Sequence, residues 1–150
     1  MNIYETIFKM PMFKNFSERD KKKFTKIEHS FLEFNRNDTI IKEGELSTDL
    51  YLLVKGTTLV TKTEGGISIR IAKLNPGDIF GEMAYYQKKP RETNVIANGP
   101  VTVLKLDDQF FKKAGSDARD KIKDYFIELL IDRLDRMNSS IMQISKVLRT

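Results

Sequence analysis

Residues 77–84 read Gly77-Asp78-Ile79-Phe80-Gly81-Glu82-Met83-Ala84, and Pro90-Arg91 follows shortly after them. A glycine turn ahead of a short helical start leaves backbone N–H groups without helical acceptors, and such groups favour an anion. The guanidinium of Arg91 can grip a phosphate through two parallel charge-assisted bonds. The carboxylate of Glu82 offers the acceptor that a ribose hydroxyl needs. This stretch therefore predicts a site for a phosphate joined to a sugar.

The spacing of all these residues together supports the predicted phosphate and sugar site, because each feature alone has a simpler explanation. Gly77 and Gly81 have the residue type of ordinary turns. Glu82 and Arg91 on their own would form a common surface ion pair. Arg91 follows Glu82 by nine residues, and further matches lie upstream.

This pattern resembles the phosphate-binding cassette of the cyclic nucleotide-binding domain family, found in bacterial catabolite-activator-type regulators and protein kinase A regulatory subunits. The matching cassette residues are Gly81-Glu82-Met83-Ala84, Pro90-Arg91 and Val95-Ile96-Ala97. The matches to the family's β-roll signature are Lys42-Glu43-Gly44-Glu45, Asp49-Leu50-Tyr51, Gly56 and the run from Leu74 to Glu82. The resemblance covers nearly the whole chain. It departs at Asn37, where the family often has glycine, but Asn also tolerates a left-handed turn.

The resemblance implies a cyclic nucleotide ligand, cyclic AMP before cyclic GMP, and no metal. The phosphate and sugar would be bound by Gly81, Glu82, Met83, Ala84, Arg91, Glu92 and Thr93. The base would meet an apolar wall formed by Val60, Ala72 and Leu74.

Glu92 departs from the family, which usually has a small residue directly after the cassette arginine. A carboxylate about 4 Å from a phosphate costs roughly 1 to 4 kcal/mol. Binding would then fall by roughly one to three decades. If only the backbone N–H of residue 92 is needed, the side chain turns to water and this cost disappears.

Between Ser30 and Leu106 the sequence has short strand-like runs separated by turn signals. Leu50-Tyr51-Leu52-Leu53-Val54 is one such run, and Gly65-Gly66 is a hairpin signal. Ile67, Ile69 and Ile71 alternate with polar residues, which predicts a half-buried strand. Strands at roughly ten-residue intervals, without long helices between them, favour an antiparallel β-roll or jelly roll. The expected single domain comprises N-terminal helices in 1–30, the roll in 31–106 with its cassette at 77–97, and C-terminal helices in 107–150.

Two helical segments are expected before the roll. A short one extends to about Met12, and a second runs from Ser17 to about His29. Ser17 has the residue type of an N-cap, with Asp20 in the acidic position of a capping box. The spacing of a helix face continues through Phe24, Ile27 and Phe31. His29 would be an ordinary surface or half-buried helix residue.

After Asp107 a helical period continues to the end of the chain. One apolar stripe consists of Ile122, Phe126 and Leu129. A heptad seam consists of Ile127, Leu130, Leu134, Met137, Ile141, Ile144 and Leu148. A straight helix rising about 1.5 Å per residue would pass beyond a small domain after Met137. We therefore assign the stripe to the protein's own roll and the seam to a homodimer through residues 127–148; the alternative packs both on the roll. The flanking positions leave parallel or antiparallel pairing open.

Composition excludes several other classes of function. The 150 residues include no cysteine and one histidine, which removes thiol nucleophiles and histidine metal cages. No nucleophile, base and orienting group recur at a known catalytic spacing, so we expect no enzyme. No apolar run is long enough for a membrane span, and the start lacks the pattern of a secretory signal. We therefore expect a cytoplasmic protein.

The net charge of +5 does not lead to a nucleic-acid assignment. The densest basic run, Arg19 to Lys26, has the pattern of the solvated face of a helix. No helix-turn-helix, zinc-finger or RNA-binding aromatic motif is present. Direct binding of nucleic acid is therefore not expected.

The function implied by the resemblance is regulatory. The chain would be a stand-alone module that binds a cyclic nucleotide and signals through its C-terminal helix to a separate effector protein. Similar bacterial regulators continue into a DNA-binding domain where this sequence stops at Thr150, so the effector is separate or these residues belong to something longer. The alternative, motivated by Glu92, is a degenerate fold that serves as a dimerisation or protein-interaction scaffold without binding a nucleotide.

Overall fold

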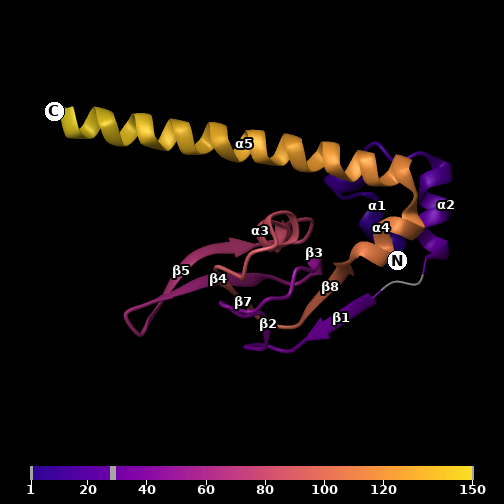
Figure 1. Cartoon of the computed structure of the whole chain (residues 1–150), viewed down its shortest axis with the longest axis horizontal. Coiled ribbons are helices and arrows are strands. Elements are labelled where there is room, and N and C mark those ends of the chain that lie inside the picture. The colour runs from indigo at the N-terminus through magenta and orange to yellow at the C-terminus, as the bar shows by residue number, and fades with distance from the viewer. Residues whose placement is uncertain (1, 28–29, 150) are drawn as a thin grey trace.

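The protein is an antiparallel β-roll with helices packed against one side, as the sequence predicts (Figure 1). The computed structural model describes residues 2–27 and 30–149. The described strands are β1 Ser30–Phe34, β2 Thr39–Ile41, β3 Leu50–Lys55, β4 Thr58–Glu64, β5 Ile67–Leu74, β6 Ile79–Phe80, β7 Asn94–Ala97 and β8 Val101–Leu106. They form two sheets with antiparallel pairing, in the orders β1-β8-β3-β6 and β2-β7-β4-β5.

Strand β3 is apolar on both faces because its sheet is covered on both sides. Leu50 and Leu52 belong to the core shared with the helices, whereas Tyr51 and Leu53 belong to the core between the two sheets. Strand β8 divides its buried side chains in the same way. This double burial explains why residues 50–54 form a continuous apolar run instead of an alternating one.

The N-terminal segment forms α1 Ile3–Phe8, the short 3-10 helix η1 Pro11–Phe13 and α2 Glu18–Lys26. The predicted capping box is present, since the Asp20 N–H donates to Ser17 Oγ over 3.1 Å and the Ser17 N–H donates to Asp20 Oδ2 over 2.9 Å. The expected helix face does not extend to Phe31. Ile27 is already extended, and Phe31 lies in β1, where strand pairing with β8 takes precedence over the helical spacing. His29 lies outside the described residues.

The glycine pair and Asn37 form the turns that the sequence predicts. Gly65 and Gly66 both have positive φ, at 57° and 80°, and join β4 to β5. Asn37 has a φ of 72°, in the left-handed region.

The half-burial expected for β5 is wrong. Ile67, Ile69 and Ile71 are all exposed. Strand β5 is at the edge of its sheet, and the β4–β5 hairpin projects away from the helical side (Figure 1). The alternation of isoleucines with polar residues correctly indicates a strand. Burial of the isoleucines would also require another layer of the protein packed over β5.

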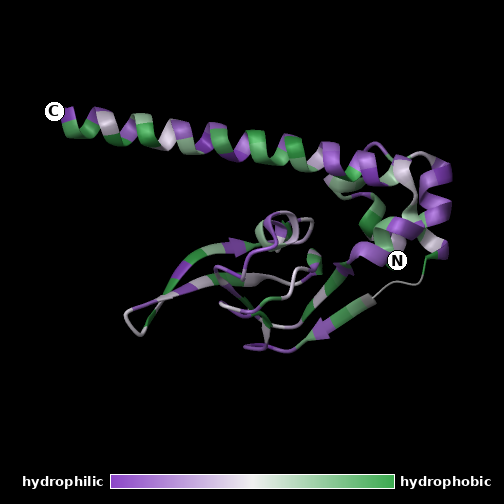
Figure 2. Cartoon of the chain, viewed as in Figure 1, coloured by the Kyte–Doolittle hydropathy of each residue, from purple (hydrophilic) through white to green (hydrophobic). Residues whose placement is uncertain are grey.

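The chain ends in α4 Asp108–Ala114 and α5 Ser116–Arg149. The 34 residues of α5 give it a length of about 50 Å, and it passes well beyond the roll (Figure 1). Ile122 and Phe126 are buried and Leu129 is half-buried, which confirms that this stripe packs on the protein's own domain. Hydrophobic residues recur along α5 to its C-terminal end (Figure 2). All seven seam residues are exposed.

Candidate functional site

A cavity of about 410 Å³ lies in the roll, lined by residues from both sheets and from α3 Glu82–Gln87. All of the site residues expected from the sequence line this one cavity: Val60, Ala72, Leu74, Gly81, Glu82, Met83, Ala84, Arg91, Glu92 and Thr93. The folded chain therefore brings the expected polar groups and the expected apolar wall together. Their roles toward a ligand remain predictions.

Gly81 shapes the polar end of the cavity. Its φ of 87° is left-handed, and a Cβ there would lie 2.8 Å from the Asp49 carbonyl oxygen and 2.9 Å from Arg91 Nη1. Only glycine fits this position without strain. The chain then enters α3 at Glu82, and the N–H groups of residues 82–84 have no intrahelical acceptor. These N–H groups belong to residues that line the cavity, where they can bind an anion.

Arg91 is buried, at 4% exposure, and neutral oxygens hold its guanidinium. Its Nε donates to Ser47 Oγ over 3.3 Å, its Nη1 to the Gly81 carbonyl over 3.0 Å, and its Nη2 to the Asp49 carbonyl over 2.7 Å. Burial lowers the pKa of this guanidinium, which nevertheless stays protonated because an arginine titrates far above neutral pH.

No carboxylate in the described part of the chain lies within 4.0 Å of the Arg91 guanidinium. A guanidinium has five N–H donors, so about two remain after the three bonds to the protein. A buried cation without a paired anion is costly. The cavity therefore favours an anionic ligand at this end.

Glu82 has a partner that the sequence did not reveal. Its Oε1 accepts a bond of 3.1 Å from Nη1 of Arg133, which projects from α5 and also lines the cavity. Both side chains are partly exposed. Arg133 is not among the site residues expected from the sequence, and no local pattern indicates that it reaches a residue 51 positions earlier.

The apolar wall is larger than the sequence analysis expected. It also includes Ile41, Ile71, Ile79, Phe80 and Val95. The alternation of apolar residues in the strands indicates which side chains could face inward, but the pairing of the strands decides which of them reach the cavity.

Glu92 lies at the rim of the cavity. The residue is exposed, and its backbone carbonyl accepts a bond of 3.0 Å from Lys62 Nζ. Thr93 is half-buried beside it. The Glu92 residue is therefore exposed to water at the rim, whereas Arg91 is buried deeper in the cavity.

The described part of the chain has neither a cluster of metal ligands nor a helix that could span a membrane. Within residues 2–27 and 30–149, no group of three or more histidine, aspartate or glutamate side chains is arranged to hold a metal ion. None of the described helices combines the length and hydrophobicity needed to cross a bilayer.

Comparison with known proteins relates the chain to one family. The family model for the cyclic nucleotide-binding domain matches residues 31–117. The cAMP-dependent protein kinase regulatory subunit of Mycosarcoma maydis is 31% identical over 105 residues, covering 69% of this chain and 20% of that protein. The chain thus spans about one fifth of the length of this curated relative.

Solved structures show the same fold. The regulatory domain of Toxoplasma gondii PKA, co-crystallised with cAMP, has a TM-score of 0.67 and 25% identity, over 84% of this chain and 49% of that one. Thermus thermophilus catabolite activator protein has a TM-score of 0.75 and 21% identity, over 90% of this chain and 63% of that one. The second likeness shows the fold alone.

Proposed function

The chain belongs to the cyclic nucleotide-binding domain family, and we propose that it is a regulatory module that binds a cyclic nucleotide and signals through α5 to a separate effector. The buried Arg91 cation supports this proposal most strongly. Among the residues that the structure describes, no carboxylate pairs with it, and it lies in the same cavity as Glu82 and an apolar wall. A cyclic nucleotide offers the matching anion, hydroxyl and base.

The proposed binding mode assigns one part of the ligand to each part of the cavity. The cyclic phosphate meets Arg91 and the N–H groups of residues 82–84. The ribose hydroxyl donates to the Glu82 carboxylate, and the base packs against Val60, Ala72 and Leu74. The cavity volume of about 410 Å³ is in the range of small-molecule sites.

We propose cyclic AMP as the preferred ligand over cyclic GMP. The names of two similar proteins support this choice: the Mycosarcoma maydis relative is cAMP-dependent, and the Toxoplasma gondii domain was crystallised with cAMP. We further propose a non-enzymatic protein that acts in the cytoplasm without a metal.

We also propose that the chain forms a homodimer through residues 127–148. The exposed seam supports this pairing, and Arg133 places the same helix at the cavity. Helix α5 is therefore the element through which an effector or a second copy could sense the ligand.

Calorimetric titration with cyclic AMP and cyclic GMP at near-physiological salt tests the proposal. Wild type should bind, and Arg91→Ala should lose about 1.5 to 3 kcal/mol for each charge-assisted bond removed, which is tenfold or more in affinity. Arg91→Lys keeps the charge and loses only the forked geometry, so it should retain part of the affinity. Lys88→Ala, which removes an exposed cation at the end of α3, should bind like wild type. The absence of both a heat of binding and a shift in the unfolding temperature at millimolar cyclic nucleotide would contradict the proposal.

A scaffold without ligand is the second candidate. Three observations favour it: the carboxylate of Glu92 at the cavity rim, the three protein acceptors that already hold Arg91, and the Arg133 contact on Glu82. The same titration separates the two candidates. A folded protein that dimerises but binds neither nucleotide would be this scaffold.

A further inference from the structure

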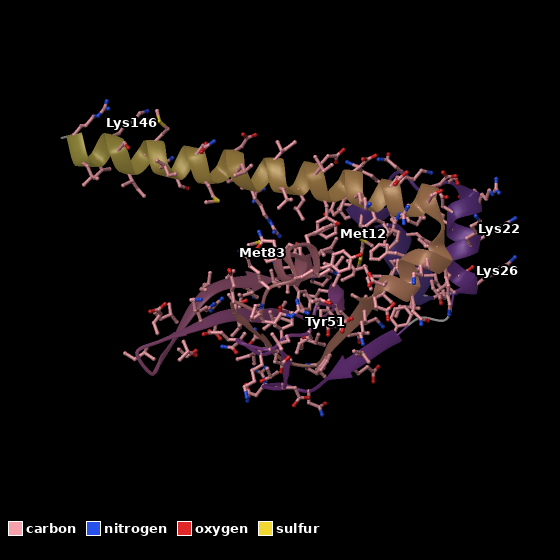
Figure 3. All side chains as sticks on the ribbon, in the orientation of Figure 1. Met12, Lys22, Lys26, Tyr51, Met83 and Lys146 are labelled. Atoms are coloured by element: carbon pink, nitrogen blue, oxygen red, sulfur yellow. The ribbon has the colours of Figure 1, made fainter. Side chains whose placement is uncertain are left out.

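Basic side chains form a stripe along the exposed face of α2. This basic stripe consists of Arg19, Lys22, Lys23 and Lys26, and all four residues are exposed. Their spacing from Arg19, by three, four and seven residues, places them on one face of the helix. Asp20 and Phe24, on the opposite face, are buried. Lys22 and Lys26 point away from the body of the protein (Figure 3).

The basic stripe has no anionic partner within the described part of the chain. Both acidic side chains of α2 are engaged elsewhere, since Glu18 pairs with Lys21 and Asp20 pairs with Lys121. No ion pair between described residues includes a member of the stripe. The positive charge of the stripe is therefore available to an anion outside the protein.

The stability of α2 does not account for the whole stripe. Like charges three and four residues apart repel one another and weaken a helix. The helix dipole favours Lys23 and Lys26, which lie in the last turn of α2. It does not favour Arg19 and Lys22, which lie closer to the start of the helix. A partner outside the chain would give these cations a role that folding does not.

The positive face continues onto the end of α4. Lys112 and Lys113 are exposed in the last turn of that helix. Lys23 reaches the same junction, because its Nζ lies 3.6 Å from the place that a Cβ on Gly115 would take. Helices α2 and α4 lie at one end of the molecule, and the C-terminus of α5 lies at the other (Figure 1). The face ends at the start of α5, where Asp117 adds a negative charge.

The chemistry of this face fits a layer of anionic lipid headgroups. The large apolar side chains of α2 and α4 are all buried, namely Phe24, Phe110 and Phe111. Specific protein interfaces centre on aromatic and other large anchors, and single-stranded nucleic acids stack their bases on aromatic side chains. An anionic membrane surface needs only clustered cations on an accessible face. Five of the six cations here are lysines, which act as point charges without a fixed hydrogen-bonding geometry.

We propose that the basic stripe and the end of α4 dock the protein on an anionic membrane surface. The attraction acts through charge, and no part of the chain enters the bilayer. Each lysine at such a surface strengthens binding by about five-fold. The β4–β5 hairpin and the C-terminal half of α5 lie away from this end, so they stay accessible (Figure 1). The docking adds a location to the proposed function and needs no ligand in the cavity.

Sedimentation of the full chain with lipid vesicles tests the docking. Wild type should sediment with phosphatidylcholine vesicles that contain about one third phosphatidylserine, and should stay in solution with pure phosphatidylcholine vesicles. Raising the salt concentration from about 0.1 M to about 1 M should release the protein, because the screening length falls from about 10 Å to about 3 Å.

Two substitutions in the basic stripe locate the contact. Lys22→Gln combined with Lys26→Gln should weaken binding to the anionic vesicles by about 25-fold, since two lysines are lost. Lys22→Arg combined with Lys26→Arg keeps the charge and should bind like wild type. Lysine, arginine and glutamine have similar helix propensities, so these variants should unfold at the same temperature as wild type.

The matched control removes the same charge from other exposed positions, as Lys55→Gln combined with Lys146→Gln. Lys55 pairs with Thr102 near the start of β8, whereas α4 follows the end of that strand. Lys146 lies near the C-terminal end of α5, at the other end of the molecule (Figure 3). This control should sediment like wild type.

Several results would overturn the docking. They are no sedimentation of wild type with the anionic vesicles, equal sedimentation with both kinds of vesicle, and equal binding by the stripe and control glutamine variants. A DNA duplex added at an equal concentration of phosphate should leave the protein on the vesicles. Displacement by the duplex would assign the face to nucleic acid instead. The assay contains no cyclic nucleotide, so its failure is distinguishable from a failure of the proposed function.

Discussion

Arg91 has a structural role as well as a predicted ligand role. Its backbone N–H donates to the Glu45 carbonyl and its carbonyl accepts from the Gly44 N–H, both over 2.8 Å. Its side chain holds the carbonyls of Asp49 and Gly81. Removing the side chain leaves these acceptors unsatisfied, at about 1 to 3 kcal/mol each if they stay buried. A binding defect in Arg91→Ala must therefore be compared with the folded fraction and with Arg91→Lys.

Glu92→Ala should tighten cyclic AMP binding. The Glu92 carboxylate lies at the rim near the phosphate end, and water partly screens it. Its repulsion of a phosphate at high effective dielectric is about 1 kcal/mol, which corresponds to an increase in affinity of about five-fold on removal. Titration at two salt concentrations measures this, and the gain should shrink at the higher one. An unchanged affinity at low salt would show that the carboxylate points to solvent.

Gly81→Ala should destabilise the fold and disrupt the site. The left-handed φ costs a side chain about 1 to 2 kcal/mol, and the new Cβ would also collide with the Asp49 carbonyl. The control is Gly66→Ala. The φ of Gly66 is also positive, but a Cβ added there would have no other residue within 4 Å apart from its chain neighbours. The Gly66→Ala variant should lose only the stability that the left-handed φ costs a side chain, and it should keep its affinity for cyclic AMP. Thermal unfolding and calorimetry of both variants measure the difference, and equal losses would contradict it.

The junction of α2 with α5 depends on one buried carboxylate. Burial alone raises the pKa of Asp20, but hydrogen bonds from Lys121 and from Ser17 outweigh it, so the pKa lies below its usual 3.8. A group with a lowered folded pKa stabilises the protein at pH values above its unfolded pKa. That stability is lost as the pH falls through the folded pKa.

Asp20→Asn should therefore be less stable than wild type at pH 7, by about 1 to 2 kcal/mol for the lost charged hydrogen bonds. The difference should shrink as the pH is lowered below about 3.8, because the carboxyl group of the unfolded wild type is protonated first and that of the folded protein follows at lower pH. Urea unfolding at pH 7 and pH 3 measures it. Glu18→Gln, on the exposed start of α2, should change stability by less than about 0.5 kcal/mol at either pH. A difference that does not depend on pH would exclude the carboxylate charge as its cause.

In the single chain the heptad seam of α5 is exposed to solvent, and we expect two copies of the protein to dimerise through it. The seam residues are 42% to 81% exposed. Burial of one such side chain contributes roughly 1.5 to 3 kcal/mol, so a second copy would be bound through several of them. Light scattering should give a dimer mass for wild type and a monomer mass for Leu134→Asp combined with Ile141→Asp.

Ser139→Asp is the matched control for this test. Ser139 lies between the two seam positions but outside the seam, and it is exposed. It should leave the dimer intact. A monomeric wild type, or a dimer that withstands both seam substitutions, would leave the seam without a role in pairing.

Features set by neighbouring residues were predictable from the sequence. The Ser17–Asp20 capping box, the Gly65-Gly66 hairpin and the left-handed Asn37 each depend on the chemistry of a few adjacent residues. The cassette belongs to the same class, because Gly81 allows a backbone conformation that positions Glu82 within one turn. The apolar periods likewise indicated the strands and the two stripes of α5, since period is a local property.

The tertiary structure alone decided which groups meet across the fold. Three protein oxygens from distant segments hold Arg91, Arg133 reaches Glu82 from 51 residues away, and the isoleucines of β5 are exposed. None of these follows from residue spacing. Contacts between distant residues depend on strand register and on the direction in which α5 leaves the body. The packing of Ile122 and Phe126 in the core that the helices share with the roll fixes that direction.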